Sequence, residues 1–210
     1  MRIVDGAGQE LAVLEAGPDS IVGALEFSPD GGMLATASFE RNRFEGAVGL
    51  WDWRDERLVR SIDLFSQGIA FSPDGRHLAT AETSGTARVW DVDTGRSVAA
   101  AQRQSGILYA VAYSPDGQTV ATAGADRTIH LWDATSGTER VALSAAEGPI
   151  GSIAFSPDGT KLVAAGEDGL ARVWALDLDD LIAIAEDELT RGLSRAECRQ
   201  FLHADTCPRS

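Results

Sequence analysis

The tetrapeptide Ser-Pro-Asp-Gly occurs four times in this chain of 210 residues, and successive copies are 44, 42 and 42 residues apart. The copies begin at Ser28, Ser72, Ser114 and Ser156. A tryptophan follows each copy, at Trp51, Trp90, Trp132 and Trp174. The first three tryptophans precede an aspartate, at Asp52, Asp91 and Asp133. Two markers that share one period indicate an internal repeat, which constrains the fold more than any other feature of the sequence.

Each repeat is predicted to contain four short β-strands. Alternating apolar residues precede Pro-Asp-Gly, which favours a tight turn because proline fixes φ and glycine adopts positive φ. A strand of small residues such as Leu-Ala-Thr-Ala (78–81) follows, then a strand that ends at the tryptophan, a polar turn and a fourth strand. This unit, at a period near 42 residues, is typical of a β-propeller blade, so we expect an all-β fold. The first strands of the repeats are expected near 24–28, 68–72, 110–114 and 152–156.

The chain resembles the WD-repeat β-propellers. The resemblance rests on aromatic-Ser-Pro-Asp-Gly, Leu-Ala-Thr-Ala and Val/Leu-Trp-Asp, and it covers residues 20–177. Members of this family often carry a histidine that bonds an aspartate, a serine or threonine, and the tryptophan. Here Gln104 stands in the histidine's place in the third repeat. The network residues that remain are Thr80 and Trp90 in the second repeat, Thr122, Asp126 and Trp132 in the third, and Asp168 and Trp174 in the fourth. A partly built polar network stabilises less than a complete one, so we expect these blades to depend on apolar packing.

The repeats account for about four blades. Residues 1–17 align with the last two strands of a blade and form a half blade, and the final repeat has three strands. About seventeen strands are too few for the seven-bladed ring that the resemblance implies. Three interpretations remain open: a piece of a longer repeat protein, a four-bladed ring in which residues 10–14 complete the last blade, or a ring closed by two chains. We favour a propeller that is open or incompletely closed, whose unpaired edge strands allow self-association. The repeats are expected at about 20–62, 63–101, 102–144 and 145–177.

The last residues change period. Apolar residues at helical spacing predict helices at 178–190 and 195–203, and thus a short helical C-terminal tail over 178–210. This tail resembles the terminal segment of large bacterial WD-repeat proteins, in which a signalling-type ATPase or a Ser/Thr kinase often precedes the repeats. Cys198, His203 and Cys207 offer three ligands of the zinc type without an evident fourth. A disulfide and free thiols are the alternatives, and we expect no metal site.

Composition excludes several classes of partner. The net charge of −14 disfavours nucleic acid, because phosphate binding needs clustered lysine and arginine, and it disfavours anionic membrane surfaces. No run of 18 apolar residues predicts a membrane-spanning helix, and the first residues show no apolar segment of a secretory signal. Both cysteines fall in the last thirteen residues, so the first 197 residues contain no disulfide. We therefore expect a cytoplasmic protein.

The connection between the second and third strands of the first repeat is unusually long. Twenty-three residues separate Ser28 from Trp51, against 18 in the other repeats, and the extra residues fall within 38–46. By the resemblance, this connection lies on the face that usually binds partners. Aromatic residues and arginine are enriched at binding hot spots. The predicted partner-binding residues are Phe39, Arg41, Arg43, Phe44 and Phe65. The alternative is a longer solvated hairpin without a binding role.

No motif in the sequence indicates catalysis. There is no phosphate-binding G-x-x-x-x-G-K-[ST] loop and no G-x-S-x-G nucleophile elbow, and His77 and His130 are interpreted as surface or packing residues. We expect no enzyme activity and no cofactor. The sequence predicts a scaffold that binds other proteins or peptides. The alternative is the C-terminal sensor or regulatory propeller of a bacterial signalling ATPase or Ser/Thr kinase whose catalytic part is not in this chain.

Overall fold

A computed structural model describes residues 1–176, except for residues 18, 41–44, 103 and 145. The described residues form seventeen β-strands in five antiparallel sheets, which confirms the all-β fold. No helix with the length and apolar character that crossing a bilayer requires is found among them. The predicted helices at 178–190 and 195–203, and Cys198, His203 and Cys207 with them, lie outside the described residues.

The strands group into a half blade and four blades, in the order of the sequence. The half blade consists of β1 (Arg2–Val4) and β2 (Glu10–Val13). Blade 1 consists of β3 (Ser20–Phe27), β4 (Met33–Glu40), β5 (Gly46–Asp52) and β6 (Arg57–Asp63). Blade 2 consists of β7 (Ser66–Phe71), β8 (His77–Glu82), β9 (Ala87–Asp91) and β10 (Ser97–Ala100). Blade 3 consists of β11 (Leu108–Tyr113), β12 (Thr119–Gly124), β13 (Thr128–Asp133) and β14 (Glu139–Ser144). Blade 4 consists of β15 (Ile150–Phe155), β16 (Lys161–Gly166) and β17 (Ala171–Ala175).

The Ser-Pro-Asp-Gly repeats form the turns between the first two strands of each blade. In blade 1, the Ser28 hydroxyl donates to Asp30 Oδ1 at 2.6 Å, and the same oxygen accepts the N–H of Gly32 at 2.8 Å. The Ser28 hydroxyl in turn accepts the N–H of Met33 at 2.8 Å, which fixes the start of β4. The serine hydroxyl lowers the pKa of the aspartate in every copy, namely Asp30, Asp74, Asp116 and Asp158.

Apolar packing between successive sheets forms the core. Each blade has a leading face toward the preceding blade and a trailing face toward the following one. In blade 2 the trailing face is made of small residues, Ala79, Ala81, Ala87 and Val89, which pack in one cluster with Leu108, Val120 and Trp132 of blade 3. Small residues let the two sheets approach closely, so Ala79 and Ala81 of β8 are fully buried. Equivalent clusters join blade 1 to blade 2 and blade 3 to blade 4.

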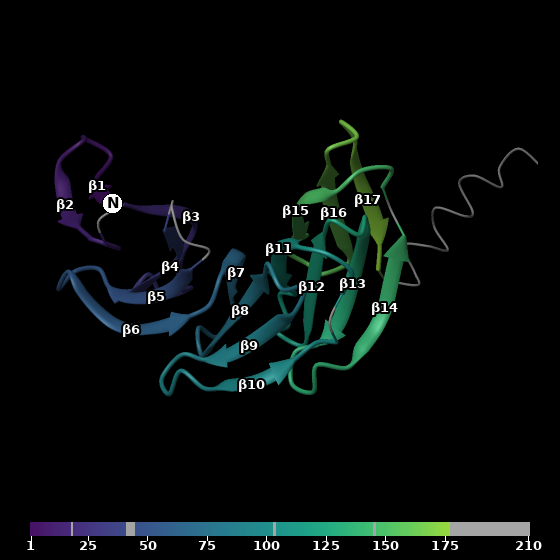
Figure 1. Cartoon of the computed structure of the whole chain (residues 1–210), viewed down its shortest axis with the longest axis horizontal. Coiled ribbons are helices and arrows are strands. Elements are labelled where there is room, and N and C mark those ends of the chain that lie inside the picture. The colour runs from purple at the N-terminus through teal and green to yellow at the C-terminus, as the bar shows by residue number, and fades with distance from the viewer. Residues whose placement is uncertain (18, 41–44, 103, 145, 177–210) are drawn as a thin grey trace, which may run out of the picture.

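The blades follow one another along a curved row (Figure 1), with the half blade at one end and blade 4 at the other. The first strands pack in sequence on the inner side, β3 against β7, β7 against β11 and β11 against β15. Strand β2, which could have completed blade 4, instead pairs with β1, and within the described residues blade 4 keeps three strands. The half blade packs its Ile3 and Leu14 against Leu34 and Trp51 of blade 1. The described chain is therefore an open arc rather than a closed ring.

Candidate functional site

The second hairpin of blade 1 extends beyond those of the other blades. Strand β4 continues to Glu40 and β5 begins at Gly46, whereas the equivalent strands of blade 2 end at Glu82 and begin at Ala87. Phe39 lies opposite Gly46 in the ladder, so the extra residues lengthen both strands. Of the predicted binding residues, Arg41, Arg43 and Phe44 lie outside the described residues.

Phe39 and Phe65 lie side by side at this end of blade 1. Their ring centroids are 5.2 Å apart and the rings are tilted by 34°. Phe65 sits in the two-residue connection between β6 and β7, and its carbonyl accepts the N–H of Thr83 in the turn of blade 2 at 3.0 Å. Both rings are half-buried. Two residues that are 26 positions apart in the sequence thus form one aromatic pair, on the face where the long hairpin emerges.

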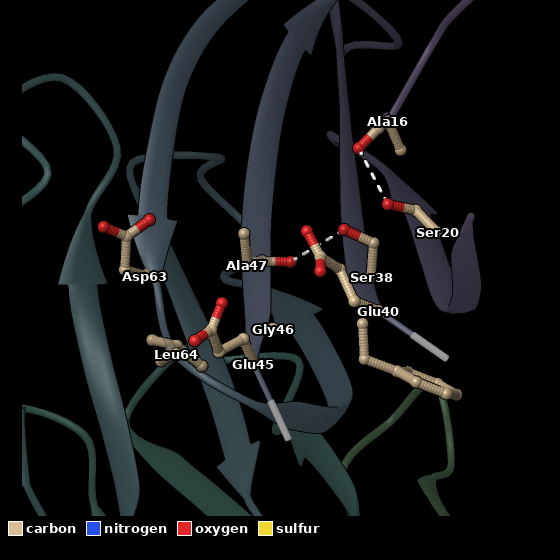
Figure 2. A pocket seen from close by; sticks show the side chains of 10 residues that line it. Ala16, Ser20, Ser38, Glu40, Glu45, Gly46, Ala47, Asp63 and Leu64 are labelled. Atoms are coloured by element: carbon tan, nitrogen blue, oxygen red, sulfur yellow. Dashed lines mark hydrogen bonds between the residues drawn. The ribbon is translucent and has the colours of Figure 1, made fainter. Parts of the chain in front are cut away.

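A groove of about 510 Å³ opens beside this aromatic pair. Figure 2 shows the carboxylates of Glu40, Glu45 and Asp63 around it, at the ends of β4, β5 and β6. The opposite wall comes from the segment that joins the half blade to blade 1, where the Ser20 hydroxyl donates to the Ala16 carbonyl at 3.1 Å. Acidic groups and one aromatic side chain, Phe39, therefore line the same groove.

Gly46 permits the close packing of this site. A methyl group at Gly46 would lie 2.9 Å from the Ser38 carbonyl oxygen and 3.0 Å from the Phe65 Cα. Both neighbours are backbone atoms, so they cannot rotate away as a flexible side chain would. The Ser38 hydroxyl also donates to the Ala47 carbonyl at 3.3 Å, which links the two strands at the same level. The sequence offered no direct signal for this contact, because glycine at position 46 resembles an ordinary loop glycine.

The repeat tryptophans have different roles in different blades. In blade 1, the Trp51 indole N–H donates to the Thr36 hydroxyl at 3.0 Å, and in blade 2 the Trp90 N–H donates to Thr80 at the same distance. Trp132 is fully buried, and its N–H has no partner among the described residues. Trp174 is half-buried in the cluster between blades 3 and 4.

In blade 3 the Gln104 side-chain amide donates to the buried Thr122 hydroxyl at 2.8 Å. Gln104 thus reaches the threonine of the network, in the position where the resemblance places a histidine. Asp126 is bonded elsewhere: its Oδ2 lies 3.1 Å from the His130 Nε2. The network is therefore split into two separate pairs rather than joined in a chain.

The sequence analysis missed a second set of polar contacts that recurs from blade to blade. The residue two positions before the tryptophan is basic in three blades, and each time it pairs with an acidic residue of the neighbouring turn. Arg172 Nη1 lies 2.7 Å from Asp168 Oδ2, and Arg88 pairs with Glu82. His130 lies between Asp126 and Glu139, whose Oε1 is 3.0 Å from its Nδ1. The 42-residue spacing of Arg88, His130 and Arg172 was the available signal. These pairs link each turn to the strand that follows it.

The aspartates after the tryptophans cap the turns that lead to the last strand. Asp91 Oδ1 accepts the Thr94 hydroxyl at 2.6 Å and the Thr94 N–H at 2.7 Å, and the hydroxyl bond is the larger cause that lowers the pKa of Asp91. Asp133 accepts the N–H groups of Thr135 and Ser136, and the Ser136 bond is the main cause of a strongly lowered pKa. Asp52 accepts the Asp55 N–H at 3.3 Å. These carboxylates are structural.

No group of three or more histidine, cysteine or acidic residues suited to a metal ion occurs in the part of the chain that the structure describes. The carboxylates around the groove do not supply such a group. The groove offers an aromatic side chain beside acidic groups, and aromatic residues are enriched at protein interfaces.

The sequence matches the family model described as WD domain, G-beta repeat, at residues 8–52, 58–91, 97–133 and 137–175. The matched segments cover more than half of the chain, and each spans the last strand of one blade and the first three strands of the next. The chain belongs to the WD40 repeat family. The first matched segment begins at residue 8 and so includes β2 of the half blade together with most of blade 1. WD40 repeats generally mediate protein interactions, and typical WD40 domains are not catalytic.

Curated relatives are other WD-repeat proteins of eukaryotes. The Protein LST8 homolog of Drosophila melanogaster is 44% identical over 50 residues, which is 22% of this chain and 16% of that protein. The WD repeat-containing protein VIP3 of Arabidopsis thaliana is 32% identical over 99 residues, 40% of this chain and 29% of that protein. The WD repeat-containing protein 1 of Mus musculus is 27% identical over 124 residues, 51% of this chain and 20% of that protein. The chain thus spans less than a third of the length of these relatives.

Proposed function

We propose that this WD40 chain is a non-catalytic scaffold that binds other proteins or peptides. The observation that carries the proposal is the groove of blade 1, where the Phe39–Phe65 pair adjoins the carboxylates of Glu40, Glu45 and Asp63. A few residues carry most of the binding energy at protein interfaces, and aromatic residues and arginine are enriched at such sites. Arg41, Arg43 and Phe44 follow Phe39 in the sequence and are proposed as further contacts.

The chemistry of the groove favours a particular kind of partner. A segment with an apolar side chain would pack on the two phenylalanines, while basic side chains would face the acidic rim. The net charge of −14 supports the same choice, since it attracts basic partners and repels nucleic acid. The proposal places this binding in the cytoplasm, because all described residues belong to segments without cysteine.

A second candidate is a sensor or regulatory propeller of a bacterial signalling ATPase or Ser/Thr kinase. The short span of the chain relative to its matches supports a larger arrangement of repeats. The resemblance of the segment after residue 177 to bacterial WD-repeat proteins is the only support for linking this candidate to a bacterial ATPase or kinase. An in-frame ATPase or kinase domain immediately upstream in the genome would favour this candidate over an independent scaffold.

The test is affinity capture from a lysate of the source organism, with the double variant Phe39→Ala/Phe65→Ala beside the unmodified chain. A matched control, Leu58→Ala, removes an exposed apolar residue from β6. A third sample, Arg41→Ser/Arg43→Ser, tests the hairpin arginines. The bound protein should be lost from the phenylalanine variant, with an affinity reduced about tenfold or more, and retained by the control.

Circular dichroism must show that each variant keeps the β-spectrum and a cooperative thermal transition. If a folded phenylalanine variant captures the same proteins in the same amounts as the unmodified chain, the groove is not the binding site and the proposal fails.

A further inference from the structure

The trailing face of blade 4 is bare, although its residues match faces that are buried elsewhere in the molecule. Val163, Ala165, Ala171 and Val173 form this face on β16 and β17. Val163 is 39% exposed and Val173 is 65% exposed, and both alanines are exposed as well. The residues 42 positions earlier are Ala121, Ala123, Ile129 and Leu131, which are all buried against blade 4. The sequence of blade 4 therefore has the pattern of a buried face, but no part of the described chain packs against this face.

The kind of surface that fits this face is visible three times in the same molecule. Each buried trailing face packs against the leading face of the next blade, where the first strand supplies aliphatic and aromatic residues and the second strand a leucine or valine. Blade 4 also lacks an outer strand among the described residues, since β17 pairs only with β16, whereas β5, β9 and β13 each pair on both sides. The open edge of β17 can accept a further strand.

The half blade and blade 1 lie at the other end of the arc (Figure 1), and apolar residues of their leading side are exposed. Because the half blade has only two strands, it leaves strand β3 of blade 1 uncovered: Leu25 is 57% exposed and Phe27 is 43% exposed. Their counterparts in blade 2, Ile69 and Phe71, are buried. In the half blade, Ile3 packs against blade 1 and lies opposite the buried Ala12, so the alternating residues Val4 and Leu11 face outward, and both are exposed.

We propose that copies of this chain associate head to tail, with the trailing face of blade 4 of one copy packed on the leading surface of the half blade and blade 1 of the next. Each copy carries both surfaces, one at each end of the arc, and both resemble the two sides of the inter-blade interfaces already present in the molecule. Such a contact is heterologous, so two copies form a ring if the rotation closes and a filament if it does not. This surface is distinct from the groove at Phe39 and Phe65, and the proposal does not depend on that groove.

Charge gives the association a characteristic salt dependence. Two copies with a net charge of −14 repel one another, while the proposed contact is apolar. Salt screens the repulsion and leaves apolar burial intact, so association should strengthen as salt is added. An interface held by ion pairs would respond in the opposite direction.

The test uses three variants that add the same charge to an exposed position. Val173→Arg blocks the trailing face and Leu11→Arg blocks the leading surface. The control, Val98→Arg, changes an exposed valine on the outer strand of blade 2. Masses are measured by light scattering after size-exclusion chromatography. The unmodified chain and the control should form dimers or larger species, while each blocked variant alone should be a monomer.

Mixing the two blocked variants decides between modes of association. The intact leading surface of the Val173→Arg protein can bind the intact trailing face of the Leu11→Arg protein, so the mixture should form a dimer and nothing larger. If Leu11→Arg alone still dimerises, the contact joins two trailing faces and the proposal is wrong. A monomeric unmodified chain would also contradict the proposal, since a segment of the same chain would then cover the trailing face of blade 4. Should Val173→Arg fail to fold, Val163→Ser provides a milder block of the same face.

Discussion

Leu131 and Val173 occupy the same position in successive blades, 42 residues apart, yet Leu131 is 7% exposed and Val173 is 65% exposed. The difference comes from their neighbours and not from their sequence context. Blade 4 covers Leu131, and the described chain has no blade that covers Val173. A repeat fold buries its apolar faces only by stacking, so the end of an incomplete array presents the surface of an interior interface.

The contributions of Gln104 and Thr122 to the free energy of unfolding should be strongly coupled. In Thr122→Val, the buried Gln104 amide loses its acceptor, and the free energy of unfolding should fall by about 1–3 kcal/mol. The double variant Gln104→Leu/Thr122→Val replaces both partners by apolar groups and should recover much of that loss. Urea denaturation of the two single variants and the double variant measures the coupling. Additive losses would show that the two side chains do not act as a pair.

Replacement of Gly46 should disturb the groove from within. In Gly46→Ala the added methyl group meets two backbone atoms, so the free energy of unfolding should fall by about 1–3 kcal/mol. Gly151 is the matched control, because a methyl group there has no atom within 4 Å. Urea denaturation of Gly151→Ala should show unchanged or slightly higher stability. Equal stability of both alanine variants would contradict the close packing at Gly46.

Glu26 should make the protein less stable as the pH rises. Partial burial raises the pKa of Glu26, against a smaller opposing effect of the Phe71 N–H, which donates to its carboxylate at 3.0 Å. With a raised pKa the folded state binds the proton more tightly than the unfolded state, so stability is lost as the pH rises from the ordinary pKa of glutamate through the raised one.

Glu26→Gln removes this charge and can still accept the Phe71 N–H. It should raise the free energy of unfolding at pH 7 by up to about 1 kcal/mol, a figure kept small by solvent screening, and should have no effect below about pH 4. Denaturation at a series of pH values checks this, with the exposed Glu167→Gln as a control for the same change of net charge. A gain of the same size at pH 3 and pH 7 would assign the effect to packing instead.

The repeat period alone predicted most of the architecture. The first strands begin up to four residues before the predicted ranges, and the half blade forms from the two segments that the alignment indicated. This success has a physical cause: turn chemistry and small-residue strands are local signals, repeated in one register. The interpretation that residues 10–14 complete blade 4 is not seen, because β2 finds its partner in β1, only a short turn away.

Contacts between distant segments were harder to predict. The sequence grouped Phe39 and Phe65 as predicted binding residues, but it did not predict that their rings pair or that Gly46 approaches the backbone of Phe65, because both contacts depend on how tightly β6 turns into β7. His130 illustrates the same limit, since its two carboxylate neighbours come from a turn and from the adjacent strand. The binding role of Phe39, Arg41, Arg43, Phe44 and Phe65 stays a prediction.

The open arc is tested most directly by sedimentation velocity of the unmodified chain, over about a hundredfold range of concentration at low and high salt. The account predicts that the weight-average mass exceeds that of one chain, rises with concentration, and rises further at high salt. A single species with the mass of one chain at every concentration and both salt levels would contradict it, because the bare faces at the two ends of the arc would then have to be covered within the monomer.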